Sequence, residues 1–238
     1  MSDSTAQEFF QPEARAAAAR SHAYAALAQL FAYPDVELRE DIQNGALETA
    51  LRTILRDIDP ALVEPANWSA LGDAGVEPDD LAVEYTRLFD AGTGGPPCPL
   101  HGGLYAGTRM KTMEEAVRFY NHFGLTLADE PRELPDHLIT QLEFMHFLAF
   151  REANALESGE DSKPFRCAQR DFLSRHPGRW VPELRSRVGS QEPMPFFGEL
   201  VARLGDFLAH DQAHLIALAG PVPGESTTTW SPQPSSQA

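Results

Sequence analysis

Apolar residues recur along this chain at helical spacing almost throughout. Tyr24, Leu27 and Phe31 stand at i, i+3 and i+7 and form one apolar stripe. The stripe lies in an alanine-rich segment and predicts a helix over residues 12–31. The proline that follows disfavours further helix, and Asp35 is a typical N-cap for a second helix. The amino-terminal third of the chain is therefore predicted to be helical.

The same spacing predicts helices along the rest of the chain. They fall at residues 35–58 with a break near Asn44-Gly45, and at 78–89, 105–123, 136–155, 165–174, 181–188 and 196–219. The helix over 136–155 is the most apolar, and its core candidates are Ile139, Leu142, Met145 and Phe150. Alternating runs long enough for a β-strand are absent. We expect an all-α fold, a single domain of roughly eight to ten helices, with a Gly/Pro-rich loop at 91–103 between two portions.

The two ends of the chain differ from this helical pattern. Residues 1–11 are predicted to be flexible, residues 12–219 to form the domain, and residues 220–238, rich in Pro, Ser and Thr, to be disordered. The first ten residues lack the apolar stretch of a signal peptide. No uncharged run reaches the ~20 residues that a membrane span needs. We therefore expect a cytoplasmic protein that is not inserted in a membrane.

Charge and cysteine content exclude several classes of function. The chain has 19 Lys+Arg and 35 Asp+Glu, a net charge of 19 − 35 = −16. Binding to nucleic acid or to an anionic membrane depends on an excess of basic residues, so a cationic partner is expected instead. Two cysteines, Cys98 and Cys167, exclude a disulfide framework and a four-cysteine zinc site.

Familiar enzyme signatures are absent from the sequence. We find no dinucleotide or phosphate-loop glycine motif, no GxSxG elbow and no HExxH. The loop at 91–103 contains no lysine, and its prolines remove backbone N–H groups that would hold a phosphate, which disfavours a nucleotide switch. Cys98 and His101 have the spacing of two metal ligands, but the second pair of a structural zinc site is missing.

A helical di-metal enzyme is the alternative interpretation. Glu143 and His146 stand at i, i+3 on one predicted helix, and Asp211 and His214 repeat this spacing on the last helix. Di-iron four-helix bundles use this arrangement, together with a glutamate from each of two further helices. Glu84 is the only attractive candidate for one of those glutamates.

Asp136 and His137 allow two interpretations. In one, Asp136 serves the start of the apolar helix and its positive dipole end, and His137 is only its neighbour. In the other, both residues line a cleft and contact a cationic or peptide ligand. Tyr85, Phe89 and Tyr105 flank the Gly/Pro loop, and a loop beside aromatic and acidic residues is typical of a peptide-binding groove.

Several motifs, in this order and spacing, resemble the TorD/DmsD/NarJ family of redox-enzyme maturation chaperones over about residues 20–215. They are Tyr24-x-x-Leu27-x-x-Leu30-Phe31-x-x-Pro34, Glu84-Tyr85-x-x-Leu88-Phe89 followed by PPCPLHGGLY, Phe119-Tyr120-x-x-Phe123-Gly124-Leu125, and Leu134-Pro135-Asp136-His137-Leu138 followed by Leu142-Glu143-Phe144-Met145. The CPLHGGLY form of the loop resembles the subgroup that serves ethylbenzene, dimethylsulfide, selenate or chlorate enzymes.

The resemblance implies a cytoplasmic, non-catalytic chaperone without a cofactor, which is a monomer or a homodimer. Such a chaperone binds the apo catalytic subunit of a molybdenum enzyme of the dimethyl-sulfoxide-reductase type, and often its twin-arginine leader. It holds this client until the molybdopterin cofactor is inserted and then permits export. The implied client-binding residues are Tyr85, Phe89, Cys98, Pro99, His101, Tyr105, Asp136, His137 and Glu143, with Asp136 pairing with leader arginines.

Overall fold

The computed structural model describes residues 9–64, 66–72, 78–105, 107–126 and 134–223. Within these residues it contains nine α-helices and no β-strand, only one isolated β-bridge, so the all-α prediction is confirmed. The helices are α1 (Pro12–Leu30), α2 (Val36–Gln43), α3 (Ala46–Ile58), α4 (Pro78–Tyr85), α5 (Arg109–His122), α6 (Leu138–Glu157), α7 (Lys163–Arg175), α8 (Pro177–Ser190) and α9 (Pro195–Ala219).

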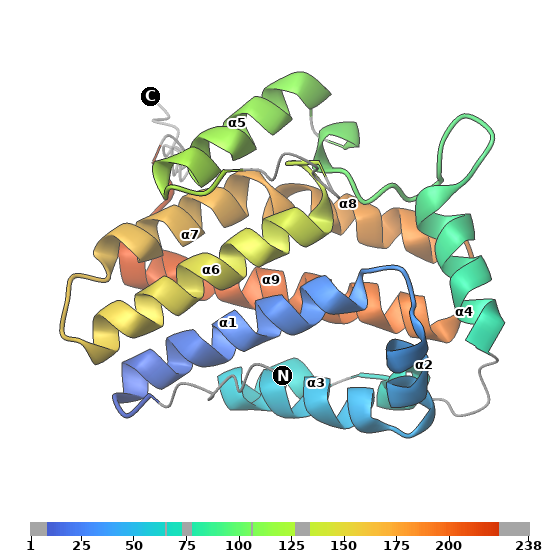
Figure 1. The fold of residues 1–238 in the computed structure, drawn as a ribbon, viewed down its shortest axis with the longest axis horizontal. Helices are drawn as coiled ribbons and strands as arrows, with labels where there is room; N and C mark the ends of the chain where they lie inside the picture. Colours follow the sequence, from blue (N-terminus) through green and yellow to red (C-terminus); the bar gives the residue numbers. More distant parts are fainter. Residues whose placement is uncertain (1–8, 65, 73–77, 106, 127–133, 224–238) are drawn as a thin grey trace, which may run out of the picture.

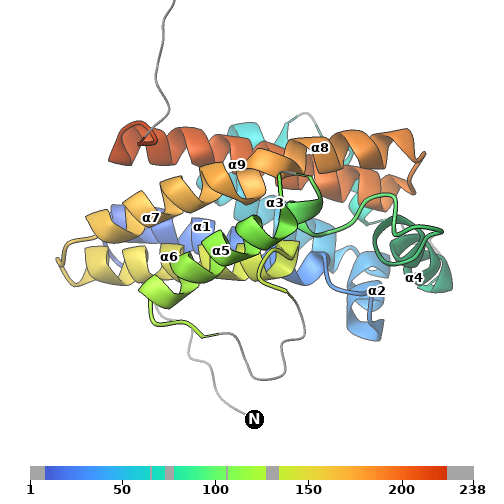
Figure 2. The same ribbon diagram turned by 90° about the horizontal axis from the view of Figure 1, so that it is seen from above.

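Helices α1, α6, α7 and α9 form the centre of the molecule (Figures 1 and 2). Helices α1 and α6 pack along most of their length and run antiparallel. The start of α1 accordingly meets the end of α6, where the amides of Phe10 and Gln11 donate to the Glu157 carboxylate. Helix α3 packs on α1 and helix α8 on α9, while α4 and α2 lie at one end. Each long helix therefore has an inner face to bury.

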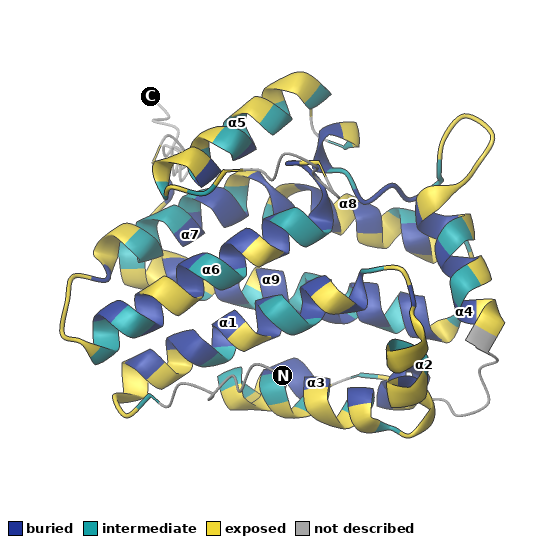
Figure 3. Ribbon diagram, in the orientation of Figure 1, coloured by how far each residue is buried: buried dark blue, intermediate teal, exposed yellow. Residues whose placement is uncertain are grey.

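The faces of the helices that point into the bundle are buried (Figure 3), and the predicted apolar stripe of α1 is buried there. Tyr24, Leu27 and Phe31 are at most 1% exposed, as their spacing predicts. The carboxylate of Asp35 accepts the Leu38 amide proton at 2.8 Å, which confirms it as the N-cap of α2. The predicted break before α3 is at Gly45, where the backbone is left-handed with φ 74°.

Three sequence predictions about helices are wrong in detail. The helix expected from residue 105 begins at Arg109, because a left-handed Gly107 (φ 84°) and an extended Thr108 precede it. Phe150, a core candidate, is 37% exposed and meets the ring of Phe9 edge-on at 6.4 Å. Helix α8 starts before the predicted residue 181, with Pro177 in its first turn, where the missing N–H costs no helical hydrogen bond.

A buried network of charged groups joins the four central helices. Arg20 on α1 donates to Glu152 on α6 and, at 2.9 Å, to Gln169 on α7. Its Nε lies 3.5 Å from a carboxylate oxygen of Asp211 on α9, and that carboxylate also accepts the Tyr24 hydroxyl proton at 2.6 Å. All five side chains are at most 2% exposed. Because buried charges are costly unless paired, these helices are constrained to one relative register.

The predictions for the two chain ends depend largely on residues 1–8 and 224–238, which lie outside the described residues. Of the helices that the structure describes, none is both long enough and apolar enough to cross a membrane.

His176, between α7 and α8, is 1% exposed, and neither of its ring nitrogens has a hydrogen-bond partner among the described residues. Burial lowers the pKa of His176 to about 4, so the ring is neutral in the fold. In the unfolded chain it takes up a proton below about pH 6.5. The contribution of His176 to stability is therefore fully present above pH 6.5 and is lost as the pH falls towards about 4.

Replacing His176 by leucine is expected to remove this pH dependence. The His176→Leu variant should gain about 2 kcal/mol in free energy of unfolding relative to the wild type when the pH is lowered from 7 to 5. Urea denaturation of both proteins at the two pH values measures the change. If the difference in free energy of unfolding between wild type and variant is the same at pH 7 and pH 5, a neutral, buried His176 is contradicted.

Candidate functional site

The Gly/Pro loop is joined to the start of α6 by the isolated antiparallel bridge between His101 and His137. The Gly102 amide donates to the Asp136 carbonyl at 2.8 Å, and a second backbone bond of the same length lies on the other side of the pair. The two histidine rings meet edge-on with centroids 4.9 Å apart. His101 and His137, which are 36 positions apart in sequence, therefore form one corner of the molecule.

Asp136 is the polar centre of this corner and is fully buried. Its carboxylate lies 3.2 Å from His101 Nδ1, accepts the Gly103 amide proton at 3.2 Å, and lies 3.7 Å from Arg109 Nε. Burial alone would raise the pKa of Asp136, but the hydrogen bond and charge of His101, the Gly103 amide and Arg109 outweigh burial and hold that pKa below its usual value. In this conformation a ligand arginine would compete with His101 and Arg109 for the carboxylate.

His137, rather than Asp136, caps α6. His137 is the N-cap residue, and its Nδ1 accepts the Ile139 amide proton at 3.3 Å. Asp136 therefore does not cap the start of α6, because its carboxylate turns back to the loop. Burial and the nearby His101 lower the pKa of His137 to about 4, against the opposing effect of Asp136, so the ring stays neutral and can accept that bond.

An aromatic stack closes the other side of the loop. The Tyr105 ring lies on Trp180 of α8, with centroids 5.1 Å apart at 26°, and the Arg187 guanidinium lies 4.3 Å from the Tyr105 centroid. A Cβ on Gly102 would come within 2.6 Å of Trp180 Nε1, so only glycine fits there. Trp180 also donates to Gln141 Oε1 at 3.0 Å. The sequence interpretation missed Trp180 and Arg187, because helical spacing alone gives no sign of what they contact.

Tyr85 and Phe89 lie in the core rather than on a groove wall. They are 8% and 6% exposed and pack against Phe197 of α9. The Tyr85 hydroxyl donates to the Phe31 carbonyl at 3.0 Å. Their segment, which continues α4 as one π-helical turn over 86–90, fixes the point at which the Gly/Pro loop leaves the bundle.

The remaining predicted site residues divide between the core and the surface. Cys98 and Pro99 are buried, and the Cys98 amide donates to the Leu88 carbonyl at 2.9 Å. Burial raises the pKa of the Cys98 thiol despite the nearby Arg187 and Arg87, so it is not a reactive thiolate. His101 and Tyr105 are partly exposed at the corner, and Glu143 is exposed on α6.

Exposed apolar side chains surround this corner. Leu104, directly after the Gly/Pro loop, is 47% exposed, Met110 in the first turn of α5 is 65% exposed, and Leu134 just before the α6 corner is 40% exposed. Exposed apolar groups gathered beside polar ones are typical of a protein-binding surface. Leu104 lies inside the PPCPLHGGLY segment, so that motif already contained the signal for it.

Two residues of the di-metal interpretation, His146 and Asp211, link helices to one another instead. His146 Nδ1 lies 2.7 Å from the Ser21 hydroxyl of α1, and Asp211 is held by Tyr24 and Arg20. Glu143 faces solvent. Across the described part of the chain, no three His, Cys, Asp or Glu side chains are grouped so that they could hold a metal ion.

Comparison with known proteins identifies the family. A family model described as nitrate reductase delta subunit matches residues 44–186, well over half of the chain. The chain belongs to this family. It is the TorD/DmsD/NarJ family. Proteins named chaperone protein TorD in Vibrio species are also similar to this chain, and the one from Vibrio parahaemolyticus is 22% identical to it over 191 residues.

The subgroup suggested by the CPLHGGLY loop is confirmed by relatives within the TorD/DmsD/NarJ family. The chlorate reductase assembly chaperone protein of Ideonella dechloratans is 35% identical over 199 residues, which cover 79% of this chain and 91% of the relative. The selenate reductase assembly chaperone protein of Thauera selenatis is 34% identical, with coverages of 77% and 88%. The dimethyl sulfide dehydrogenase assembly chaperone protein of Rhodovulum sulfidophilum is 33% identical, with coverages of 72% and 72%. These names describe assembly chaperones and not catalysts.

Proposed function

We propose that this protein is a system-specific assembly chaperone for a molybdenum enzyme of the dimethyl-sulfoxide-reductase type. It binds the cofactor-free catalytic subunit, and its twin-arginine leader, in the cytoplasm. It keeps this client open for insertion of molybdopterin and releases it for export afterwards. The observation that carries the proposal is the 35% identity to the chlorate reductase assembly chaperone protein across 91% of that relative.

The charge of the chain supports the same partner. A net charge of −16 repels nucleic acid and other acidic surfaces, whereas a leader with paired arginines is cationic. Opposite charges accelerate encounter and disfavour wrong partners, so binding of the client should weaken as salt is added.

We place contacts with the body of the catalytic subunit at the corner formed by the Gly/Pro loop and the start of α6. In this proposal the nine family site residues have three roles. His101, Tyr105 and Glu143 contact the client; Cys98, Pro99, Asp136 and His137 hold the loop in position; Tyr85 and Phe89 anchor the segment before it. The exposed Leu104 supplies apolar contact area at the centre of this surface.

A matched pair of leucine variants tests this proposal. The probe is the precursor of a catalytic subunit of the dimethyl-sulfoxide-reductase type from the same organism, made without molybdopterin and captured by the tagged wild-type chain. Leu104→Asp is expected to weaken capture by about tenfold, because loss of one apolar contact at the centre of an interface typically lowers the affinity by about that factor. Leu218→Asp is the control, since Leu218 on α9 is 45% exposed against 47% for Leu104.

The outcomes of this experiment separate function from location. Equal capture by both leucine variants would place the client elsewhere on the chaperone. Failure of the wild type to capture the cofactor-free precursor would contradict the proposed function. Both variants change exposed side chains, so their circular dichroism and thermal midpoints should match those of the wild type.

A further inference from the structure

A small groove, the α8–α9 groove, lies between the start of α8 and the middle of α9. Its volume is about 180 Å³. A cavity of about 150 Å³ holds one benzene molecule, whereas pockets for drug-sized ligands begin at about 300 Å³. The groove therefore has room for one aromatic side chain. Its walls are small or apolar residues, which are Gly178, Val181 and Pro182 from α8 and Gly205, Leu208 and Ala209 from α9.

One polar side chain in the lining of the α8–α9 groove is left unpaired. The side-chain oxygen and nitrogen of Gln212 are both buried, and neither forms a hydrogen bond with any residue that the structure describes. A buried amide without a partner is costly, so native proteins rarely contain one. We therefore expect an occupant with an apolar body and one hydrogen-bonding group, a combination that tryptophan and tyrosine side chains have.

The chain contains one such side chain outside the described residues. Residues 224–238, GESTTTWSPQPSSQA, follow the described part of the chain, and Trp230 is the only aromatic residue among them. Their only charged residue is Glu225, so they contribute little to the negative charge of the protein. Residues 1–8, MSDSTAQE, contain no aromatic residue. Trp230 is therefore the side chain that matches the groove.

The described chain ends within reach of the α8–α9 groove. After α9, the Arg170 guanidinium of α7 donates to the Ala219 carbonyl at 2.6 Å. Ser174, which belongs to the groove lining, lies one turn further along α7, about 6 Å along the helix axis. The stretch from Pro223 to Trp230 spans up to about 23 Å when extended. The indole ring can therefore return to the groove from the end of α9.

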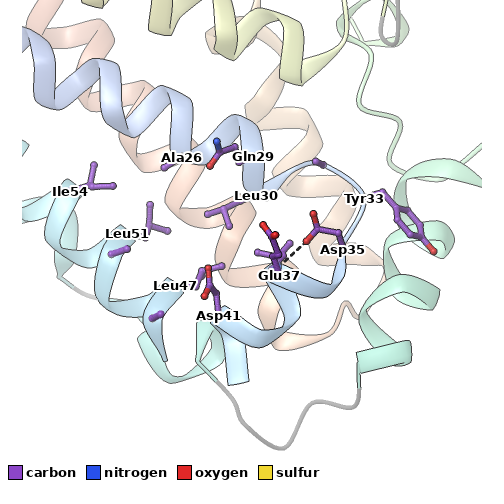
Figure 4. A pocket seen from close by; sticks show the side chains of 14 residues that line it. Ala26, Gln29, Leu30, Tyr33, Asp35, Glu37, Asp41, Leu47, Leu51 and Ile54 are labelled. Carbon is purple, nitrogen blue, oxygen red and sulfur yellow. Dashed lines mark hydrogen bonds between the residues drawn. The ribbon is translucent and has the colours of Figure 1, made fainter. Parts of the chain in front are cut away.

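A larger groove, between the end of α1, the short α2 and the first half of α3, does not match this tail (Figure 4). Its volume is about 520 Å³, and Asp35, Glu37 and Asp41 line its side towards α2. Residues 224–238 contain no lysine or arginine that would pair with these carboxylates. The chemistry of the tail therefore favours the α8–α9 groove.

We propose that the chain's own tail, residues 224–238, docks in the α8–α9 groove. The indole ring of Trp230 lies against Pro182 and Leu208, and its N–H donates to the side-chain oxygen of Gln212. Docking removes the apolar surface of the indole from water and gives the Gln212 amide a partner. Because the tail is tethered to α9, its effective concentration at the groove is of millimolar order, and weak contacts are enough to hold it. Tail docking is separate from client binding, and neither requires the other.

Fluorescence quenching by acrylamide tests this docking on the full chain. The other two tryptophans, Trp68 and Trp180, are 7% and 2% exposed, so Trp230 is the only tryptophan that acrylamide reaches readily when the tail is undocked. Subtracting the emission of Trp230→Phe from that of the wild type isolates the signal of Trp230. Its quenching constant is expected to be about fivefold lower than that of a synthetic peptide of residues 224–238, because the tether keeps most tails docked.

A matched pair of alanine variants locates the docking site. Ala209→Phe fills the groove with a side chain of α9, so the quenching constant of Trp230 should rise to within about twofold of the free peptide. Ala217→Phe places the same side chain at an exposed position of α9 outside the lining and should leave the quenching constant unchanged. Gln212→Leu removes the hydrogen-bond acceptor and should raise the constant about threefold. Each variant is compared with its own Trp230→Phe counterpart.

The outcomes separate docking in the groove from other arrangements of the tail. Quenching of Trp230 in the wild type as strong as in the free peptide would contradict docking. Protection that is retained in Ala209→Phe, or lost equally in Ala217→Phe, would overturn the assignment to this groove. Protection that disappears on dilution would show that the tail docks on a second copy, which contradicts docking within one chain. Ala209 and Ala217 are both exposed, so these variants should keep the circular dichroism and thermal midpoint of the wild type.

Discussion

Replacing Arg20 by alanine is expected to lower the free energy of unfolding by about 3–5 kcal/mol. Arg20 is 2% exposed and is the only residue that contacts Glu152, Gln169 and Asp211 together among those described. Its removal leaves two carboxylates buried at the centre of four helices with fewer partners. Glu152 keeps Arg166 and Gln169, but Asp211 keeps only the Tyr24 hydroxyl in this network. Urea denaturation at neutral pH measures the loss.

Arg15→Ala on the same helix is the control for this prediction. Arg15 is exposed, so its removal should change the free energy of unfolding by no more than about 0.5 kcal/mol. A loss of less than about 1 kcal/mol for Arg20→Ala would show that the network does not constrain the bundle.

Asp136→Ala is expected to be the second most damaging substitution, with a loss of about 2–4 kcal/mol in the free energy of unfolding. The variant leaves the buried Gly103 amide without its acceptor and removes the partner of His101 and Arg109. Because the loop also packs on Trp180, near-ultraviolet circular dichroism should change as well. Chemical denaturation combined with that spectrum measures both effects.

The pH dependence of this loss has a definite sign. The pKa of Asp136 is lower in the fold than in the unfolded chain, so its contribution is present above the ordinary carboxyl pKa and is lost as the pH falls through the folded value. The difference in free energy of unfolding between the wild type and Asp136→Ala should therefore become smaller as the pH is lowered. Asp90→Ala, at an exposed position just before the Gly/Pro loop, should have little effect. A difference in free energy of unfolding that stays constant from neutral to acidic pH would contradict a buried, ionised Asp136 carboxylate.

Helices were predictable from the sequence because their signals are local. Apolar stripes, the Asp35 cap and the break at Gly45 all act within one or two turns, and the structure has each of them as predicted. The start of α5 was misplaced because the left-handed Gly107 separates Tyr105 from the helix that its spacing suggested. Phe150 was misplaced because an aromatic residue at helical spacing does not reveal which face of the helix meets a neighbour.

The site was predictable only in part, for a related reason. The motifs indicated that His101, Asp136 and His137 matter, and the structure brings these three residues together. Spacing could not show that Tyr85 and Phe89 are core residues, or that Trp180 lies against the loop, since these contacts join residues far apart in sequence. The groove between α1, α2 and α3 depends on how a short helix is placed and left no motif.

The most direct test of the chaperone function is the dependence of binding on the cofactor. Native mass spectrometry would be applied to the full chain co-expressed with the molybdoenzyme precursor from the same organism, in cells with and without molybdopterin synthesis. A one-to-one complex containing the cofactor-free precursor, and little or no complex with the cofactor-loaded form, is the predicted result. Equal binding of both forms, or binding of neither, would contradict a role in assembly.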